Sequence, residues 1–156
     1  MAIVKLQSFK KILKPGQCIL GLDHGLKTIG LSISDQLLII ASPLRTITRT
    51  KFSTDIFVLK KIIKKFDIGA VVIGLPINMN GTEGPRCQSV RQFVSNLLSV
   101  IEVPVSFWDE RLSTAAINRV LISEADMSRK KRNKIIDKMA AAYILQGALD
   151  SLSQNK

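Results

Sequence analysis

The sequence predicts an α/β fold with one mixed sheet, in which an antiparallel three-stranded meander is continued by parallel strands and flanked by helices. Three short apolar segments follow one another between residues 17 and 44. The apolar spacing then changes from the period of a strand to that of a helix. Two later apolar runs alternate with helical segments, which is typical of parallel strands joined by helical crossovers.

The meander occupies the first part of the chain. Residues 17–23, QCILGLD, form an apolar run that ends in an acid, and residues 28–34, TIGLSIS, alternate apolar with small side chains. Residues 24–27 are expected to form the turn between them. A third strand is expected over 37–44, after a tight connection at Asp35 and Gln36.

Helices and strands alternate after the meander. A helix is expected over 54–66, capped by Ser53 or Thr54, because its apolar residues share one face. The four lysines between residues 60 and 65 lie on the flanks of that helix, and we interpret them as a solvated surface. Residues 69–76, GAVVIGLP, have the pattern of a strand buried on both faces.

The remaining elements follow the same alternation. Pro85 begins a second helix over 85–100, and a short strand follows over 103–110. The last part is expected to contain a brief helix over 113–122, a polar and basic loop over 123–134, and a helix over 134–150.

The composition describes one globular domain, residues 1–156, with a basic N-terminal arm over 1–16 and a frayed tail over 151–156. Hydrophobic residues make up 46% of the chain, which excludes a disordered protein. Lys and Arg total 23 against 12 acids, and this net charge of +11 favours a polyanion such as nucleic acid. Ribosome-associated proteins and proteins that bind anionic membranes share this bias.

The expected location is the cytoplasm, with no membrane association. The N-terminus lacks the uninterrupted apolar core of a signal peptide, and no apolar run approaches the ~18 residues that a membrane span needs. Cys18 and Cys87 have no zinc-ligand spacing, so reduced thiols are expected.

Three acids fall at positions where ligands gather in such a sheet. Asp23 ends the first strand, Glu110 ends the last, and Asp137 lies near the start of the terminal helix. Carboxylate oxygens suit Mg²⁺ or Mn²⁺, and two such ions can activate water and stabilise the leaving oxygen of a phosphodiester. Simpler roles compete with this one: Asp23 as a turn residue paired with Lys27, and Asp137 as a partner of its helix dipole.

The WDER segment leaves one choice open. Strand alternation places Asp109 and Glu110 on opposite faces of the sheet, so only one of them is expected to face the site. Spacing alone does not decide between them.

Four segments, in order, resemble the characteristic blocks of the YqgF family, a RuvX-like, RuvC-related group described as Holliday junction resolvases or pre-16S rRNA nucleases. They are LGLDHGLKTIGLSISD, VVIGLPINMNGTEGP, FWDERLSTAAINRVL and DKMAAAYILQGALD. The resemblance covers about residues 17–150. It implies an RNase H-like fold and a nuclease that needs a divalent metal. From the carboxylate ligands, the expected cofactor is Mg²⁺ or Mn²⁺, with two ions.

The resemblance implies a role in 5′-end maturation of pre-16S rRNA, with cleavage of branched DNA at Holliday junctions as the alternative. A catalytically weak RNA-binding factor of ribosome assembly is a third hypothesis. By the family pattern the catalytic and metal-binding acids are Asp23, Glu110 and Asp137. The pattern thus favours Glu110 over Asp109, which stays the alternative. His24 and Thr28 depart from the pattern, since a small residue or proline and an arginine are more usual there.

A set of residues is expected to bind substrate phosphates, through positive charge, side-chain amides or the backbone N–H groups of a loop. Well-formed turns and solvated side chains are the simpler reading of the same residues. The set consists of Lys27, Asn78, Gly81, Arg86, Arg111, Arg129, Lys130, Lys131 and Arg132.

Two further alternatives concern function and assembly. The pattern D-x-G-x-x-x-x-G from Asp23 to Gly30 also begins the phosphate-binding hairpin of actin-like ATPases and sugar kinases, but those need two lobes. A resolvase acting on a junction is expected to be a C2 dimer, whereas trimming one RNA end needs only a monomer. Ribosomal particles are a further expected partner.

Overall fold

The computed structural model describes residues 3–112 and 129–154. In chain order the elements are η1 (Leu6–Ser8), α1 (Phe9–Ile12), β1 (Cys18–His24), β2 (Thr28–Ser34), β3 (Ala41–Thr48), α2 (Phe52–Lys65), β4 (Ile68–Leu75), α3 (Pro85–Leu98), β5 (Val105–Asp109), η2 (Glu110–Leu112) and α5 (Arg129–Gln154).

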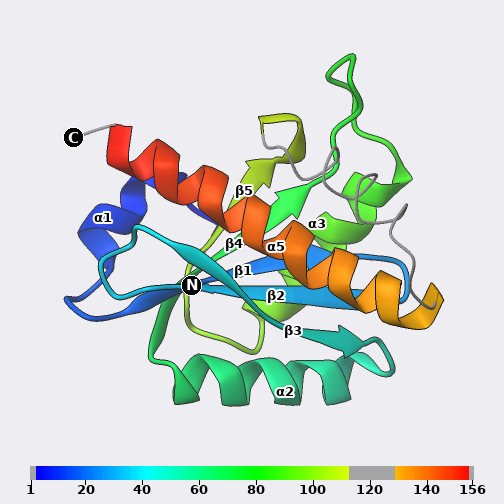
Figure 1. Cartoon of the computed structure of the whole chain (residues 1–156), viewed down its shortest axis with the longest axis horizontal. Coiled ribbons are helices and arrows are strands. Elements are labelled where there is room, and N and C mark those ends of the chain that lie inside the picture. Colours follow the sequence, from blue (N-terminus) through cyan, green and yellow to red (C-terminus); the bar gives the residue numbers. More distant parts are fainter. Residues whose placement is uncertain (1–2, 113–128, 155–156) are drawn as a thin grey trace.

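The five strands form one mixed sheet in the order β3-β2-β1-β4-β5 (Figure 1). β1, β2 and β3 pair antiparallel through short connections, and β4 and β5 extend the sheet in parallel after the helical crossovers α2 and α3. The predicted fold class, a meander continued by parallel strands, is therefore confirmed.

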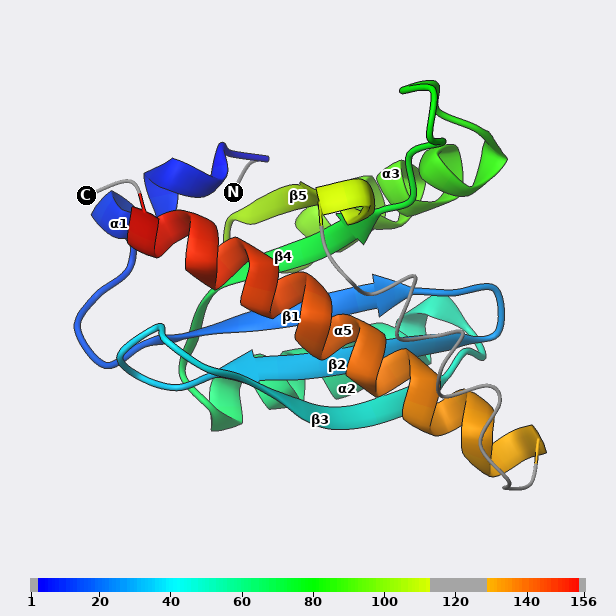
Figure 2. The same cartoon turned by 45° about the horizontal axis from the view of Figure 1, so that its top comes forward.

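Helices cover both faces of the sheet (Figure 2). Leu20 and Leu22 of β1 belong to the apolar cluster that α2 and α3 complete, whereas Ile19 belongs to the cluster formed with α1 and α5. Every residue of β1 and β4 is buried, as expected for strands with helices on both sides. The centre of the sheet is thus closed to water, and its ends are the places where polar groups can act.

Small residues bring α5 into direct contact with β1 and β2. A Cβ atom on Gly21 would lie 2.8 Å from the Cβ of Leu145, and one on Gly30 would collide with the carbonyl of Asp137. The buried Ser32 hydroxyl donates to the carbonyl oxygen of Ala141 at 2.7 Å. The first half of α5 is therefore positioned by the sheet itself.

The third strand differs from its prediction. β3 begins at Ala41, and residues 35–40 form a loop in place of the tight turn expected at Asp35 and Gln36. Asp35 Oδ1 accepts the backbone N–H groups of Ile39 and Ile40 at 2.7 and 3.0 Å. Gln146 of α5 donates to the Ile39 carbonyl at 2.9 Å, so the wider loop is stabilised by tertiary contacts that spacing does not show.

Two further boundaries differ. α2 begins at Phe52 without a side-chain cap, so neither Ser53 nor Thr54 has the predicted capping role, and the Asp55 carboxylate accepts the N–H of Thr50, just before the helix, at 3.3 Å. β5 ends at Asp109, so Glu110 begins η2 instead of ending the strand.

Both ends of the described chain are more ordered than predicted. The expected N-terminal arm contains η1 and α1, Phe9 is fully buried, and Val4 N–H donates to the Val105 carbonyl at 2.9 Å. α5 continues to Gln154 with Leu152 buried, so residues 151–154 are not a frayed tail.

The start of α5 also differs. It begins at Arg129, so residues 129–134 are helical and not part of the predicted loop. The helix predicted over 113–122 lies outside the described residues. Within the described ranges, no helix combines the length and apolar character that crossing a membrane requires.

Candidate functional site

The candidate site lies where β1, β4 and β5 end. Asp23 is the last residue but one of β1, is only 5% exposed, and pairs with Gly30 of β2. Residues directly opposite one another in an antiparallel pair share a face. Because Gly30 faces α5, Asp23 lies on the α5 side of the sheet.

Glu110 reaches the same side from the start of η2, directly after β5. The last pair of β1 and β4 is Leu22 with Ile73, and Asp23 and Gly74 are the next residues of the two strands. A Cβ on Gly74 would lie 3.1 Å from Glu110 Cγ and 2.5 Å from Ile144 Cδ1 of α5. The Glu110 side chain therefore extends over β4 toward β1. Gly74 leaves the space that this side chain fills.

Asp137 completes the set from α5. Its Oδ2 accepts a hydrogen bond from the Thr28 hydroxyl at the start of β2, and its backbone packs against Gly30. The three predicted acids thus belong to one face and one end of the sheet. Within the described residues, however, no three His, Cys, Asp or Glu side chains are arranged to hold a metal ion together.

Joint binding of a metal ion by Asp23, Glu110 and Asp137 therefore stays a prediction. The Thr28 hydroxyl engages one oxygen of Asp137. Thr28, which departs from the family pattern, has a defined partner in the site.

The structure separates Asp109 from Glu110. Asp109 Oδ2 forms an ion pair with Arg111 Nη2 at 2.7 Å, and Oδ1 accepts the Arg111 backbone N–H at 2.9 Å. The Arg111 guanidinium holds the pKa of the Asp109 carboxyl below its usual range. The Asp109 carboxylate is therefore paired with Arg111, while the Glu110 side chain lies over Gly74 on the α5 face.

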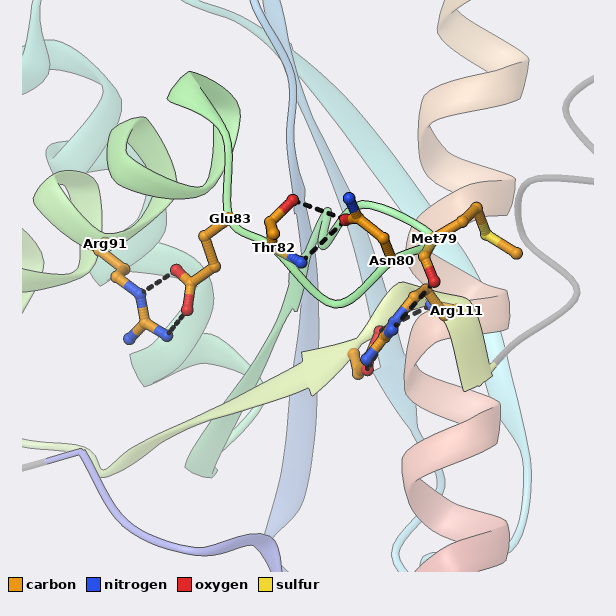
Figure 3. A network of polar contacts seen from close by, with 7 residues as sticks. Met79, Asn80, Thr82, Glu83, Arg91 and Arg111 are labelled. Carbon is orange, nitrogen blue, oxygen red and sulfur yellow. Dashed lines mark hydrogen bonds and ion pairs between the residues drawn. The ribbon is translucent and has the colours of Figure 1, made fainter.

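Arg111 also contacts the loop that follows β4. Its Nη1 donates to the Met79 carbonyl oxygen at 3.5 Å, beside the turn that Asn80 and Thr82 close with a 2.6 Å hydrogen bond (Figure 3). Part of the positive charge that the sequence suggested for phosphate binding thus stabilises this loop.

Asn78 and Gly81 build the turn itself. The Asn78 carbonyl oxygen accepts the Gly81 N–H at 2.8 Å, and Asn78 Nδ2 donates to the Thr82 hydroxyl at 3.0 Å. Gly81 has φ of 88°, which favours glycine. The simpler reading of these two residues is therefore observed, and their contact with substrate stays a prediction.

Two arginines fix the turn that follows Asp23. Arg49 Nη1 donates to the carbonyl oxygens of Gly25 at 2.7 Å and Leu26 at 3.0 Å, and Arg86 Nη2 donates to that of His24 at 3.3 Å. Phosphate binding was predicted for Arg86, whereas no role was predicted for Arg49, which directly follows β3 and has no signal in the local sequence. Lys27 is exposed on this turn.

The remaining four predicted phosphate-binding residues, Arg129 to Arg132, occupy the first turns of α5. Their side chains lie outside the described part of the structure. The prediction for them stays open.

His24 is a buried neutral base next to Asp23. It is 4% exposed, its ring lies 4.5 Å from that of Phe93, and its Nε2 is buried with no hydrogen-bond partner among the described residues. Burial, followed by the charges of Arg49 and Arg86, lowers the pKa of His24 to about 4. Its aromatic packing explains a histidine where a small residue is more usual.

The lowered pKa predicts a specific pH dependence of stability. The pKa of His24 is 6.5 when unperturbed and about 4 when folded, so the unfolded chain binds more protons between these values. The free energy of unfolding should therefore fall as pH decreases from 6.5 toward 4, by up to about 1.4 kcal/mol per pH unit from this group. His24→Phe should flatten this slope in urea unfolding followed with chelator present, whereas equal slopes in both proteins would contradict a neutral buried His24.

The arrangement of strands and helices is the RNase H-like fold. The structure titled "T. thermophilus RuvC in complex with Holliday junction substrate" aligns with a TM-score of 0.53 and 14% identity, over 86% of this chain and 94% of that one. A second structure, of Thermus thermophilus RuvC, aligns with a TM-score of 0.52 and 12% identity, over 88% of this chain and 97% of that one.

Sequence comparison identifies the family within that fold. The family model described as "RuvX: Holliday junction resolvase" matches residues 17–151, and the chain belongs to this family. A protein of Rhodospirillum rubrum is 50% identical over 156 residues, which is 100% of this chain and 97% of that protein. One of Phenylobacterium zucineum is 52% identical over 153 residues, 97% of this chain and 98% of that protein, and both bear the name "Putative pre-16S rRNA nuclease".

Proposed function

We propose that this protein is a divalent-metal-dependent endonuclease that hydrolyses phosphodiester bonds in the 5′-end maturation of pre-16S rRNA. The observation that supports this most is the buried carboxylate of Asp23, at the end of the central strand and on the same face as Glu110 and Asp137. Several carboxylates on one face supply the oxygen ligands that divalent cations prefer. The names of the relatives supply the substrate.

The donor set fits a hard divalent cation. Asp23, Glu110 and Asp137 would hold Mg²⁺ or Mn²⁺, expected as two ions, through oxygen ligands. The Cys87 thiol lies in the apolar core, and burial raises its pKa, so it does not provide the thiolate that would bind a metal ion. When bound, such ions activate a water molecule and stabilise the leaving oxygen of a phosphodiester.

The protein's own residues position the acids. Thr28 orients Asp137 through its hydroxyl, and Arg49 and Arg86 fix the backbone just after Asp23. Gly74 leaves room for Glu110 to reach the α5 face. These contacts would limit how far the three acids must move to share a cation, which reduces the reorganisation needed during reaction.

Nucleic acid is the proposed partner, and charge supports it. The chain has a net charge of +11, and exposed Lys27 and Arg86 lie beside the turn that follows Asp23. Arg111, Asn78 and Gly81 are proposed to contact phosphate at the loop after β4, and residues 129–132 from the start of α5. A monomer is sufficient to cleave one RNA end. Ribosomal particles as partners and a cytoplasmic location remain predictions.

Resolution of branched DNA is the second candidate, and the description of the family model favours it. It requires a C2 dimer that presents two equivalent sites to one junction. Cleavage separates these candidates from each other and from a binding factor.

The experiment compares a labelled precursor of 16S rRNA with a four-way DNA junction, each in Mg²⁺, Mn²⁺ or chelator. We expect cleavage of the precursor near the mature 5′ end, with metal only. Paired nicks in the junction and an intact precursor would favour the resolvase. Tight metal-independent RNA binding with neither substrate cut would overturn the nuclease and favour an assembly factor.

A further inference from the structure

A groove of about 420 Å³ lies between β3 and α2. α2 packs on the side of the sheet away from α5, so the groove is remote from the acids of the candidate site (Figure 2). We call it the β3–α2 groove. Its apolar wall includes Leu44, Phe57 and Phe66, and its cationic rim consists of Arg45, Lys61 and Lys65.

Phe57 is the unusual member of the wall. Its side chain is 58% exposed, although it belongs to a helix whose apolar residues Ile56, Leu59 and Ile62 are buried in the core. Leu44 and Phe66 pack against the core cluster and form the more covered part of the wall. Single exposed apolar side chains are common on protein surfaces, whereas an exposed phenyl ring within a concave apolar surface is typical of a binding site.

The rim is positively charged. Lys61 Nζ lies 4.5 Å from the centre of the Phe57 ring, and Lys65 Nζ lies 5.3 Å from that of Phe66. Arg45 supplies a third cation from β3, and no acidic side chain of the described chain lines the groove. Part of the lysine-rich segment of α2 therefore surrounds an apolar surface.

We propose that the β3–α2 groove docks an extended segment of a partner protein in which a bulky apolar side chain is flanked by Asp or Glu residues. The apolar side chain would fill the groove beside Phe57, and the carboxylates would complement Arg45, Lys61 and Lys65. β3 lies at one edge of the sheet, so an extended segment can run along it (Figure 1).

An acidic peptide fits this surface better than RNA does. Single-stranded nucleic acid usually binds by stacking bases on aromatic faces. Lys61 already lies over one face of the Phe57 ring, at 4.5 Å from its centre, so that face is not open to a stacking base. This surface and its partner are separate from the nuclease activity proposed above.

The test is selection of binding peptides from a displayed random library about ten residues long, enough to run along β3 when extended. We expect the selected peptides to combine an apolar residue with flanking acids. Their affinity, measured by fluorescence anisotropy, should fall at least about tenfold in Phe57→Ser and in the double variant Lys61→Glu, Lys65→Glu.

Matched control variants introduce the same changes of charge and polarity as the groove variants, but at exposed residues outside the groove. Leu37→Ser alters another exposed apolar side chain, and Lys11→Glu with Lys14→Glu reverses two exposed lysines at α1. These controls should bind the peptides as the wild type does, and all variants should unfold at similar temperatures and cleave RNA normally.

Three outcomes would overturn the proposal: no peptide selected, peptides without the acidic and apolar pattern, or peptides whose binding is equal in the groove and control variants. An equal loss of affinity for single-stranded RNA in the groove variants, without loss in the controls, would assign the surface to RNA instead.

Discussion

Replacing Asp23 by asparagine is expected to slow phosphodiester cleavage by about a thousandfold, the scale of losing a principal electrostatic contact at a reacting centre. Asparagine has nearly the same shape, so the pairing of residue 23 with Gly30 should persist, but the negative charge needed to hold a divalent cation is lost. Single-turnover cleavage of the labelled precursor in saturating Mg²⁺ measures the effect.

Asp67→Asn is the matched control for this change. Asp67 precedes β4, at the end of the sheet away from the acids, and is exposed with φ of 52°, which asparagine tolerates. It should cleave normally. Wild-type cleavage by a folded Asp23→Asn protein would remove Asp23 from catalysis and, with it, the proposed metal site.

The fold was predictable because the strands and helices have clear apolar periods. β1 and β4 are buried along their whole length and lie within one residue of their expected bounds. The start of β3 was wrong because Leu37, Ile39 and Ile40 have the composition of a strand but are exposed in a loop. Asp35 and Gln146 stabilise that loop, and the long-range contact from Gln146 has no signal in local sequence.

The site was predictable in part. The position of Asp23 near the end of β1 followed from the order of strands, and the preference for Glu110 came from the family pattern. The other two positions differ from their predictions, because Glu110 begins η2 and Asp137 lies well inside α5, which begins at Arg129. The Asp109–Arg111 ion pair agrees with that preference. The role of Arg49 was not predictable, because its contacts with the β1–β2 turn depend on how the chain returns after β3.

Close approach of backbones is the other feature that the sequence hides. Gly30 lies in the middle of strand β2, where no turn requires a glycine. The need for a glycine becomes clear only in the folded structure, where α5 packs directly on this position. A Cβ at this position would collide with the carbonyl carbon and oxygen of Asp137 and lie 3.0 Å from the Lys138 nitrogen. All three are backbone atoms of a helix, which cannot rotate away as a side chain can.

Gly30→Ala is therefore expected to destabilise the protein by about 3 kcal/mol, at the upper end of the usual cost of overpacking a core. The helix must move away from β2, and Asp137 moves with it, so cleavage per folded molecule should fall as well. Urea unfolding measures the first effect, and cleavage at a temperature where the variant stays folded measures the second.

Gly84→Ala separates this steric effect from a general cost of replacing glycine. A Cβ at Gly84 would meet its nearest neighbour, Asn78 Nδ2, at an ordinary contact distance of 3.6 Å, and the stability should change by less than about 0.5 kcal/mol. If Gly30→Ala unfolded at the same urea concentration as Gly84→Ala, α5 would not lie against β2 as closely as the structure has it. Loss of cleavage without loss of stability would instead mean that the helix yields at little cost, and that the position of Asp137 is what the glycine protects.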